Sequence, residues 1–296
     1  MIDRALIFAD PGIVNLIKTK TIPVAIDQWN QRRQKDSEGD FYRKIAAQGP
    51  RHDFENGTTQ GLYMAAADGT FLGYTNNRSP ERVKEFFDEA LKKHRPSSTS
   101  KLKVETQDQR FTYRPPEGGL VVRVQAKVLG GYDEPETQFA QIFQTAVARD
   151  NLWLTKEEHE ALAAGRFPER AALRLVRYHL VDNTRGESPL WEAKDVVSQR
   201  ITINDGRITG HMELKTPNGE RSYSADLLGY VKVSQGKVVQ LDMVARGDFS
   251  GAGQYTGGAP KGKFPLAVSF TLADGTDIAD QVPPQGARGW VADYLR

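Results

Sequence analysis

Three glycine-containing turns divide the segment that begins at Val196 into strands of alternating polarity. The turns are Asp205-Gly206, Asn218-Gly219 and Ser234-Gln235-Gly236. Glycine in such turns supplies the positive φ angles that a tight hairpin needs. The pattern therefore predicts an antiparallel meander, to which residues 264–272 add a further strand.

The registers of the three hairpins can be compared with one another. Two-residue turns are expected at the first two sites and a three-residue turn at the third. The apolar face is then continuous across four strands, which supports the pairings, because a slip by one residue would move a whole strand's apolar side chains to the other face. The predicted pairs are Ile203 with Ile208, Leu214 with Tyr223, and Leu227 with Met243.

The polar face of this meander carries the first candidate site. In the predicted register His211 lies opposite both Asp226 and Arg200, while Arg246 lies opposite Ser224 and diagonal to Asp226. A histidine oriented by a carboxylate is suited to acid–base chemistry, which makes His211, Asp226 and Arg246 candidate catalytic residues. A solvated sheet face with opposite-charge cross-strand pairs has the same pattern, and this interpretation is favoured because no nucleophile motif accompanies the histidine.

A second candidate site follows a helix that is predicted to begin at Pro168. His179 and Asp182 could together bind a metal ion, with Arg185 and Trp191 close in sequence. Two ligands do not complete a metal site, and no second histidine stands at ligand spacing. A helix-end histidine with a capping aspartate is the favoured interpretation, and the sequence points to no particular cofactor.

Two further motifs near the end of the chain are rejected as ligand sites. Residues 257–263 match the Gly-x4-Gly-Lys pattern of a phosphate-binding loop, but Phe264 stands where Ser or Thr is needed and a strand follows. A mobile or ligand-covering loop is expected instead. Asp274, Asp277 and Asp280 lack the glycine and closing glutamate of a calcium loop, so they are predicted to be turn and capping residues.

The chain before residue 96 has a different pattern of elements. A helix begins at Asp10-Pro11, residues 22–27 read as a short buried strand, and Asp68-Gly69 joins two strands. Ser79-Pro80 then begins a helix with one apolar face. The order is helix, strand, helix, hairpin and helix.

This order resembles the later part of a thioredoxin-like domain, from about Ile13 to Leu91. The resemblance rests on the segments "ADPGIVNLIKTKTIPVAID", "TTQGLYMAAADGTFLGY" and "SPERVKEFFDEALKK". The family's proline, expected near Gln60-Gly61, is missing, and the chain contains no cysteine. The resemblance therefore implies a fold and no activity, and dithiol oxidoreductase chemistry is excluded.

The small polar residues 96–100 predict a boundary between two domains. Residues 1–95 are expected to form a thioredoxin-like module without redox cysteines. Residues 101–296 are expected to form an antiparallel β domain with a helical insertion at about residues 135–190. The predicted fold class is thus α+β, an incomplete thioredoxin-like α/β module followed by an antiparallel β-sandwich or open barrel.

Charge and hydropathy narrow the range of partners. The 40 Lys and Arg residues nearly balance the 38 Asp and Glu residues, so nothing in the charge pattern favours nucleic acid. No apolar run approaches the ~18 residues of a membrane span, and residues 1–10 lack the pattern of a signal peptide. The absence of cysteine is compatible with an exported or periplasmic bacterial protein.

Three functional hypotheses follow from these patterns. The leading one is a non-catalytic binding or scaffolding protein, whose partner is an unknown protein or small ligand. The alternative is a hydrolase or metal-assisted enzyme that acts at the domain junction or on the His211 face. A third is a β domain that binds a sugar or another small ligand on aromatic stacking platforms, for which the candidates are Tyr223, Tyr230, Tyr255 and Trp191.

Overall fold

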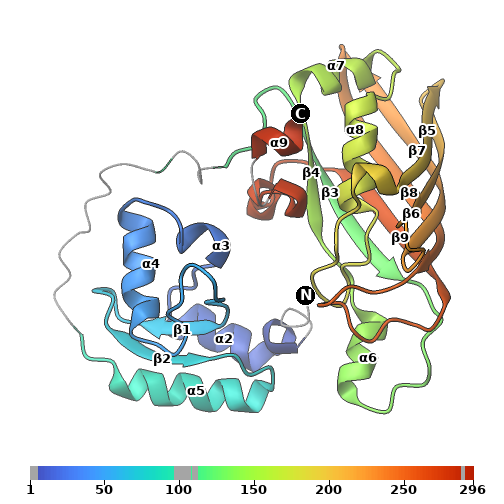
Figure 1. The fold of residues 1–296 in the computed structure, drawn as a ribbon. Coiled ribbons are helices and arrows are strands. Elements are labelled where there is room, and N and C mark those ends of the chain that lie inside the picture. The colour runs from blue at the N-terminus through green and yellow to red at the C-terminus, as the bar shows by residue number, and fades with distance from the viewer. Residues whose placement is uncertain (1–5, 97–107, 109–112, 288–290) are drawn as a thin grey trace. The chain divides into compact units, whose positions relative to one another are not determined.

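The computed structural model describes residues 6–96, 108, 113–287 and 291–296 (Figure 1). The chain divides by its internal contacts into two compact units, one of residues 3–113 and one of residues 114–296. Both helices and strands are present, which confirms the α+β class. Apart from Pro96, the predicted boundary at residues 96–100 lies outside the described residues. Within the described residues, no helix combines the length and the apolar character that crossing a membrane requires.

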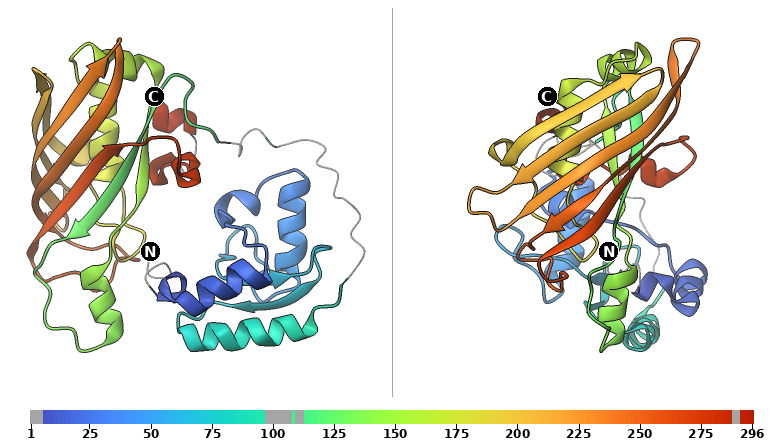
Figure 2. Two further views of the ribbon diagram at one scale, coloured as in Figure 1. Left: turned by 180° about the vertical axis from the view of Figure 1, so that it is seen from behind. Right: turned by 90° about the vertical axis from the view of Figure 1, so that its right-hand side faces the viewer.

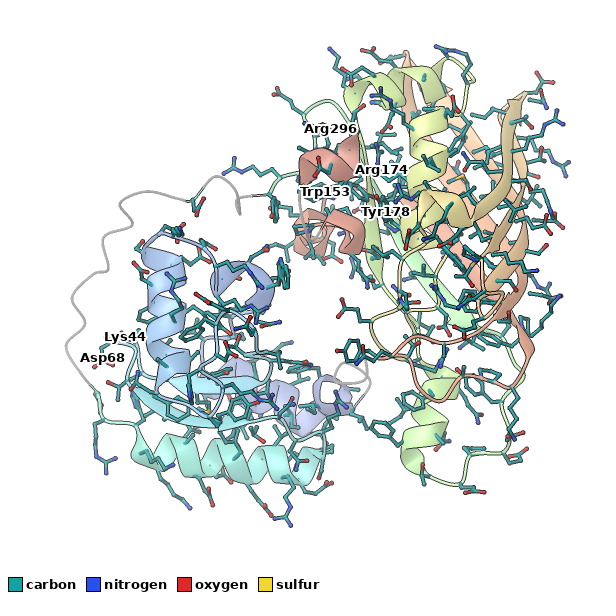
Figure 3. The ribbon with its side chains drawn as sticks, in the orientation of Figure 1. Lys44, Asp68, Trp153, Arg174, Tyr178 and Arg296 are labelled. Carbon is teal, nitrogen blue, oxygen red and sulfur yellow. The ribbon has the colours of Figure 1, made fainter. Side chains whose placement is uncertain are left out.

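The N-terminal unit combines helices with one short hairpin. Helix α2 is capped by Asp10, whose side chain accepts a hydrogen bond from the Ile13 amide at 2.9 Å, and Ser79 caps α5. Lys44 of α4 donates to the Asp68 carbonyl at 2.7 Å and so ties that helix to the hairpin turn (Figure 3). The elements are η1 (Ile7–Ala9), α2 (Pro11–Lys20), α3 (Gln28–Gln31), α4 (Ser37–Ala47), β1 (Leu62–Ala65), β2 (Phe71–Thr75) and α5 (Pro80–Lys93).

The core of this unit lies between α2, α5 and the hairpin. Ile13 and Val83 are fully buried, and Phe87 and Leu72 pack in the same cluster. The apolar positions of α5 recur at helical spacing, which places Val83, Phe87 and Ala90 on its buried face.

The prediction of a short buried strand at residues 22–27 is wrong. This segment has no regular secondary structure, and its side chains are exposed, with Ile22 at 91%, Val24 at 73% and Ile26 at 44%. No described residue forms a hydrogen bond with the backbone of residues 22–26. The run has the composition of a strand, but in the described part of this unit the sheet pairs β1 with β2, and no described strand lies beside the run.

The C-terminal unit is built on one curled, seven-stranded antiparallel sheet that forms a half-barrel (Figure 2). Of the two predicted alternatives, it corresponds to the open barrel, since a single sheet curves around the core. The strand order is β4-β3-β9-β8-β7-β6-β5. The strands are β3 (Leu120–Val128), β4 (Asp150–Leu154), β5 (Val196–Asn204), β6 (Arg207–Lys215), β7 (Ser222–Ser234), β8 (Lys237–Ser250) and β9 (Lys263–Leu272).

The predicted helical insertion also contains a strand, because β4 lies within it and pairs with β3. Thr137 caps the first insertion helix, and Thr155 and Glu158 form the predicted capping box of the next. The helical elements of this unit are α6 (Gln138–Thr145), α7 (Lys156–Ala163), α8 (Glu169–Arg174), a π-helical turn η2 (Leu175–His179), η3 (Ala193–Asp195), η4 (Ile278–Gln281), η5 (Gln285–Ala287) and α9 (Val291–Leu295).

Two of the three predicted hairpin registers are confirmed. Ile203 pairs with Ile208 and Leu214 with Tyr223, but Leu227 pairs with Ala245 rather than with Met243. The third turn has two residues instead of three, and an irregularity between Lys232 and Val233 moves the register by one more position. The total shift is even, so the predicted apolar face of β7 and β8 remains correct.

The concave face of the sheet carries the core of the C-terminal unit, and α7 and α8 lie against it (Figure 1). An aromatic cluster, in which successive ring centroids lie 5.5–6.1 Å apart, fills one part of this core. Trp191 and Tyr223 belong to it and are fully buried, so they cannot serve as sugar-stacking platforms, whereas Tyr230 and Tyr255 are exposed. The members of the cluster are Trp191, Tyr223, Phe249 and Phe264.

Candidate functional site

His211, Asp226 and Arg246 lie in one cross-strand row on the convex face of the sheet. His211 pairs with Arg200 of β5 on one side and with Asp226 of β7 on the other, as predicted. Arg246 of β8 lies directly opposite Asp226, because of the shifted register, and not opposite Ser224. Three neighbouring strands therefore place a carboxylate between an imidazole and a guanidinium.

The geometry of this row is that of an open surface pair. Nδ1 of His211 lies 2.7 Å from Oδ1 of Asp226, and the two side chains are 55% and 86% exposed. The carboxylate fixes one ring nitrogen and leaves Nε2 facing outward. No described residue of this unit closes over the pair, so the surrounding water screens it.

On this open face, His211→Ala is expected to change the free energy of unfolding by less than about 1 kcal/mol. The reason is that an exposed ion pair contributes little once water and salt screen it. Thermal melting of the full chain measures the effect, with Thr209→Ala, on the same strand and face, as the matched control. A melting temperature that barely moves, together with a lost ligand-induced thermal shift, would instead identify a working site at His211.

His179 and Asp182 are both buried, but each has its own partners. Nδ1 of His179 lies 3.0 Å from Oδ2 of Asp150, an ion-pair distance without hydrogen-bond geometry. Nε2 of His179 lies 2.8 Å from the hydroxyl of Tyr294. Burial raises the pKa of Tyr294 well above its ordinary value, so this hydroxyl keeps its proton and can donate a hydrogen bond to Nε2.

Asp182 is engaged by its own neighbours in the chain. Its Oδ1 accepts hydrogen bonds from the Thr184 hydroxyl at 2.6 Å and the Thr184 amide at 3.2 Å, while its Oδ2 pairs with the guanidinium of Arg185. Both carboxylate oxygens are therefore occupied. Among the described residues, no group of three or more His, Asp or Glu side chains could hold a metal ion.

Arg185 links this segment to the glycine-rich loop. Its guanidinium donates to the carbonyl of Thr256 and, at 3.3 Å, to that of Gly257. The Thr256 hydroxyl in turn accepts from the Gly253 amide. The loop between β8 and β9 is thus anchored from inside the unit, and β9 begins at Lys263, where a phosphate-binding loop would require a helix.

The three aspartates with calcium-like spacing are paired with arginines. Asp274 and Asp280 each lie 2.7 Å from Arg123, and Asp277 lies 2.8 Å from Arg149. Hydrogen bonds from the amide and hydroxyl of Thr276, and then from Arg123, lower the pKa of Asp274 to about 2. Asp277 caps η4 and Asp274 accepts from the Thr276 amide in a turn, so the predicted roles are confirmed for these two, whereas Asp280 lies within η4 and is buried against Arg123.

Sequence analysis missed a buried ionic centre at Arg174. Its guanidinium contacts Oε2 of Glu158 and the Leu295 carbonyl at 2.8 Å, the Tyr294 carbonyl at 2.6 Å and the Trp153 carbonyl at 3.1 Å (Figure 3). This centre fastens α9 to α7, α8 and β4. Glu158 had a signal as the third residue of a capping box, but an arginine on a short helix ordinarily indicates a surface position.

The N-terminal unit offers a different kind of surface, made by the exposed segment 22–26 and the following helix α3. Trp29 of α3 is partly exposed, and the guanidinium of Arg33 lies 3.6 Å from its ring centroid. This stacking covers one face of the indole. Ile22, Val24 and Ile26 have no such stacking partner among the residues that the structure describes, and their side chains are exposed.

Comparisons with family models, with curated proteins and with solved structures gave no match for this chain. The geometry described above therefore carries the functional argument.

Proposed function

We propose that this chain is a non-catalytic binding protein, and that its N-terminal unit is a thioredoxin-like docking module. One observation carries the proposal. Residues 22–26 present apolar side chains to solvent, and their backbone groups have no hydrogen-bond partner among the described residues. Exposed apolar segments with open backbone groups are typical of protein-binding edges.

The thioredoxin-like assignment is supported by the succession of α2, the β1–β2 hairpin and α5, which lie in the three resembling segments in that order. A binding role, rather than catalysis, is supported by the surroundings of the candidate catalytic and metal-binding side chains. His211 and Asp226 stand on an open face, whereas the contacts of His179 and Asp182 are made within the unit. A thioredoxin-like module without thiols can still bind a partner through the surface of its fold.

The proposed docking edge predicts that the chain binds extended apolar peptides. A fluorescein-labelled peptide of alternating Val and Thr should bind the full chain and slow amide hydrogen exchange at Val24 and Ile26, since it can complete a β ladder on one edge of the segment. Val24→Asp should weaken this binding at least about tenfold, because a charge would enter an apolar contact.

The matched control is Val239→Asp, which places the same charge at an exposed valine of the C-terminal unit. It should leave peptide binding unchanged. A proline homopolymer of the same length lacks every ladder donor, whichever of its edges faces the segment, and should not bind. Binding that Val24→Asp leaves intact, or exchange protection outside residues 22–26, would refute the docking edge.

A further inference from the structure

The exposed segment lies between two residues with strand-like backbone angles, and no described strand pairs with it. Thr21 and Asp27, at its two ends, both have extended backbone angles. The apolar side chains of Ile22, Val24 and Ile26 stand at every second position, which places them on one face of an extended chain. Water can hydrogen-bond to the open backbone groups, but the apolar side chains are stabilised only when another apolar surface removes them from water. The fitting occupant is therefore another extended, apolar strand.

We propose that this occupant is the same segment of a second copy of the chain, paired antiparallel about a two-fold axis at Val24. The inference rests on the proposed function, because it names the partner of the same docking edge. In this register Val24 faces Val24 of the partner subunit, and Ile22 faces Ile26 of the partner subunit. Such an isologous contact uses one surface patch on both copies.

The position of Pro23 fits this register. Alternate residues of an antiparallel strand direct their N–H and C=O groups to opposite sides. If Ile22, Val24 and Ile26 direct theirs to the second copy, Pro23 directs its backbone away from it. The donor that proline lacks is then not needed for the ladder.

Charges at the two ends favour the antiparallel direction. Lys18 and Lys20 precede the segment at the end of α2, Asp27 follows it, and all three are exposed. Residues 21–26 carry no charge. Antiparallel pairing brings the lysine end of each copy beside the aspartate of the other, whereas parallel pairing would bring like charges together.

The contact is small, which determines how it must be measured. Pairing over a few residues falls below the ~1,000 Å² that stable interfaces bury, so the dimer is a weak one. Sedimentation equilibrium of the full chain from about 10 µM to about 1 mM should show the average mass rising from 33.0 kDa toward twice that value. Val24→Asp should raise the dissociation constant at least about tenfold, and Val239→Asp should not change it.

Single-cysteine variants test the register, because the chain has no cysteine of its own. With oxidised glutathione as the oxidant, Val24→Cys should form a disulfide-linked dimer, since directly opposed residues have Cα atoms about 5.5 Å apart. Ile22→Cys should not, because the two Ile22 positions would stand about 13 Å apart along the strands. The double variant Ile22→Cys with Ile26→Cys should crosslink again.

The possible results separate this inference from the proposed function. A chain that stays monomeric at all concentrations but binds the Val/Thr peptide would refute the second copy and leave the docking edge intact. A chain that neither dimerises nor binds the peptide would refute both. A dimer in which Val24→Cys and Ile22→Cys crosslink equally would refute the two-fold register.

Discussion

Replacing Arg174 with alanine is expected to destabilise the C-terminal unit by about 3–5 kcal/mol. The side chain is almost completely buried, and so is its partner Glu158. Removing the guanidinium would leave the glutamate as an uncompensated buried charge. It would also leave the carbonyls of Trp153, Tyr294 and Leu295 without the hydrogen bonds that hold α9.

Urea denaturation of the full chain, followed by tryptophan fluorescence, measures this effect. Lys156→Ala is the matched control, because Lys156 also pairs with a glutamate of α7 but lies exposed, 3.9 Å from Glu160. It should cost less than about 0.5 kcal/mol. Combining Arg174→Met with Glu158→Gln should recover part of the loss, since no buried charge then lacks a partner. A cost below about 1 kcal/mol for Arg174→Ala would show that water reaches the site.

Features that depend on neighbours in sequence were predictable. Asp10, Ser79 and Thr155 cap their helices as expected, because a cap needs only a short polar side chain beside the first helical turn. The turns at Asp205-Gly206 and Asn218-Gly219 fixed their registers for the same reason. These two registers are sufficient to place His211 opposite Asp226.

Features that depend on a distant partner were not predictable. The run at residues 22–26 has the composition of a strand, but composition does not reveal whether a neighbouring strand exists. The same limit applies to the β7–β8 register, where an irregularity at Lys232 leaves no mark in the pattern. Arg174 and Arg185 bind carbonyls far away in the chain, so their burial could not be inferred from their own helix or loop.

The candidate sites show the same division. His211 and Asp226 were placed together because cross-strand neighbours follow from turn geometry, whereas Arg246 was expected opposite Ser224 and lies opposite Asp226. The pairing of His179 with Asp150 and Tyr294 was missed, since it joins η2, β4 and α9 across the core. The expected link between His179 and Asp182 was based on their closeness in sequence. The π-helical turn η2 ends at His179 and the chain then changes direction, so closeness in sequence does not bring the two side chains together.

Trp191→Ala is expected to have an effect of similar size on the C-terminal unit, about 3–5 kcal/mol. The indole is fully buried, its ring centroid lies 6.1 Å from that of Phe249, and the guanidinium of Arg221 stacks on it at 4.2 Å. Burial lowers the pKa of Arg221, whose guanidinium also donates to the Pro189 carbonyl at 2.7 Å. Alanine would leave a cavity and remove the stacking contact together.

The indole N–H also contributes a hydrogen bond to the stability of this unit, and a second variant measures that contribution by itself. It donates to the Leu180 carbonyl at 2.7 Å, so Trp191→Phe would keep most of the apolar contact and leave that carbonyl unpaired, at a cost of about 1–3 kcal/mol. Tyr255→Ala, an aromatic deletion at an exposed position, is the matched control and should cost less than about 0.5 kcal/mol. Urea denaturation compares the three variants. If Trp191→Ala cost no more than Tyr255→Ala, the indole would not be packed into the core of this unit.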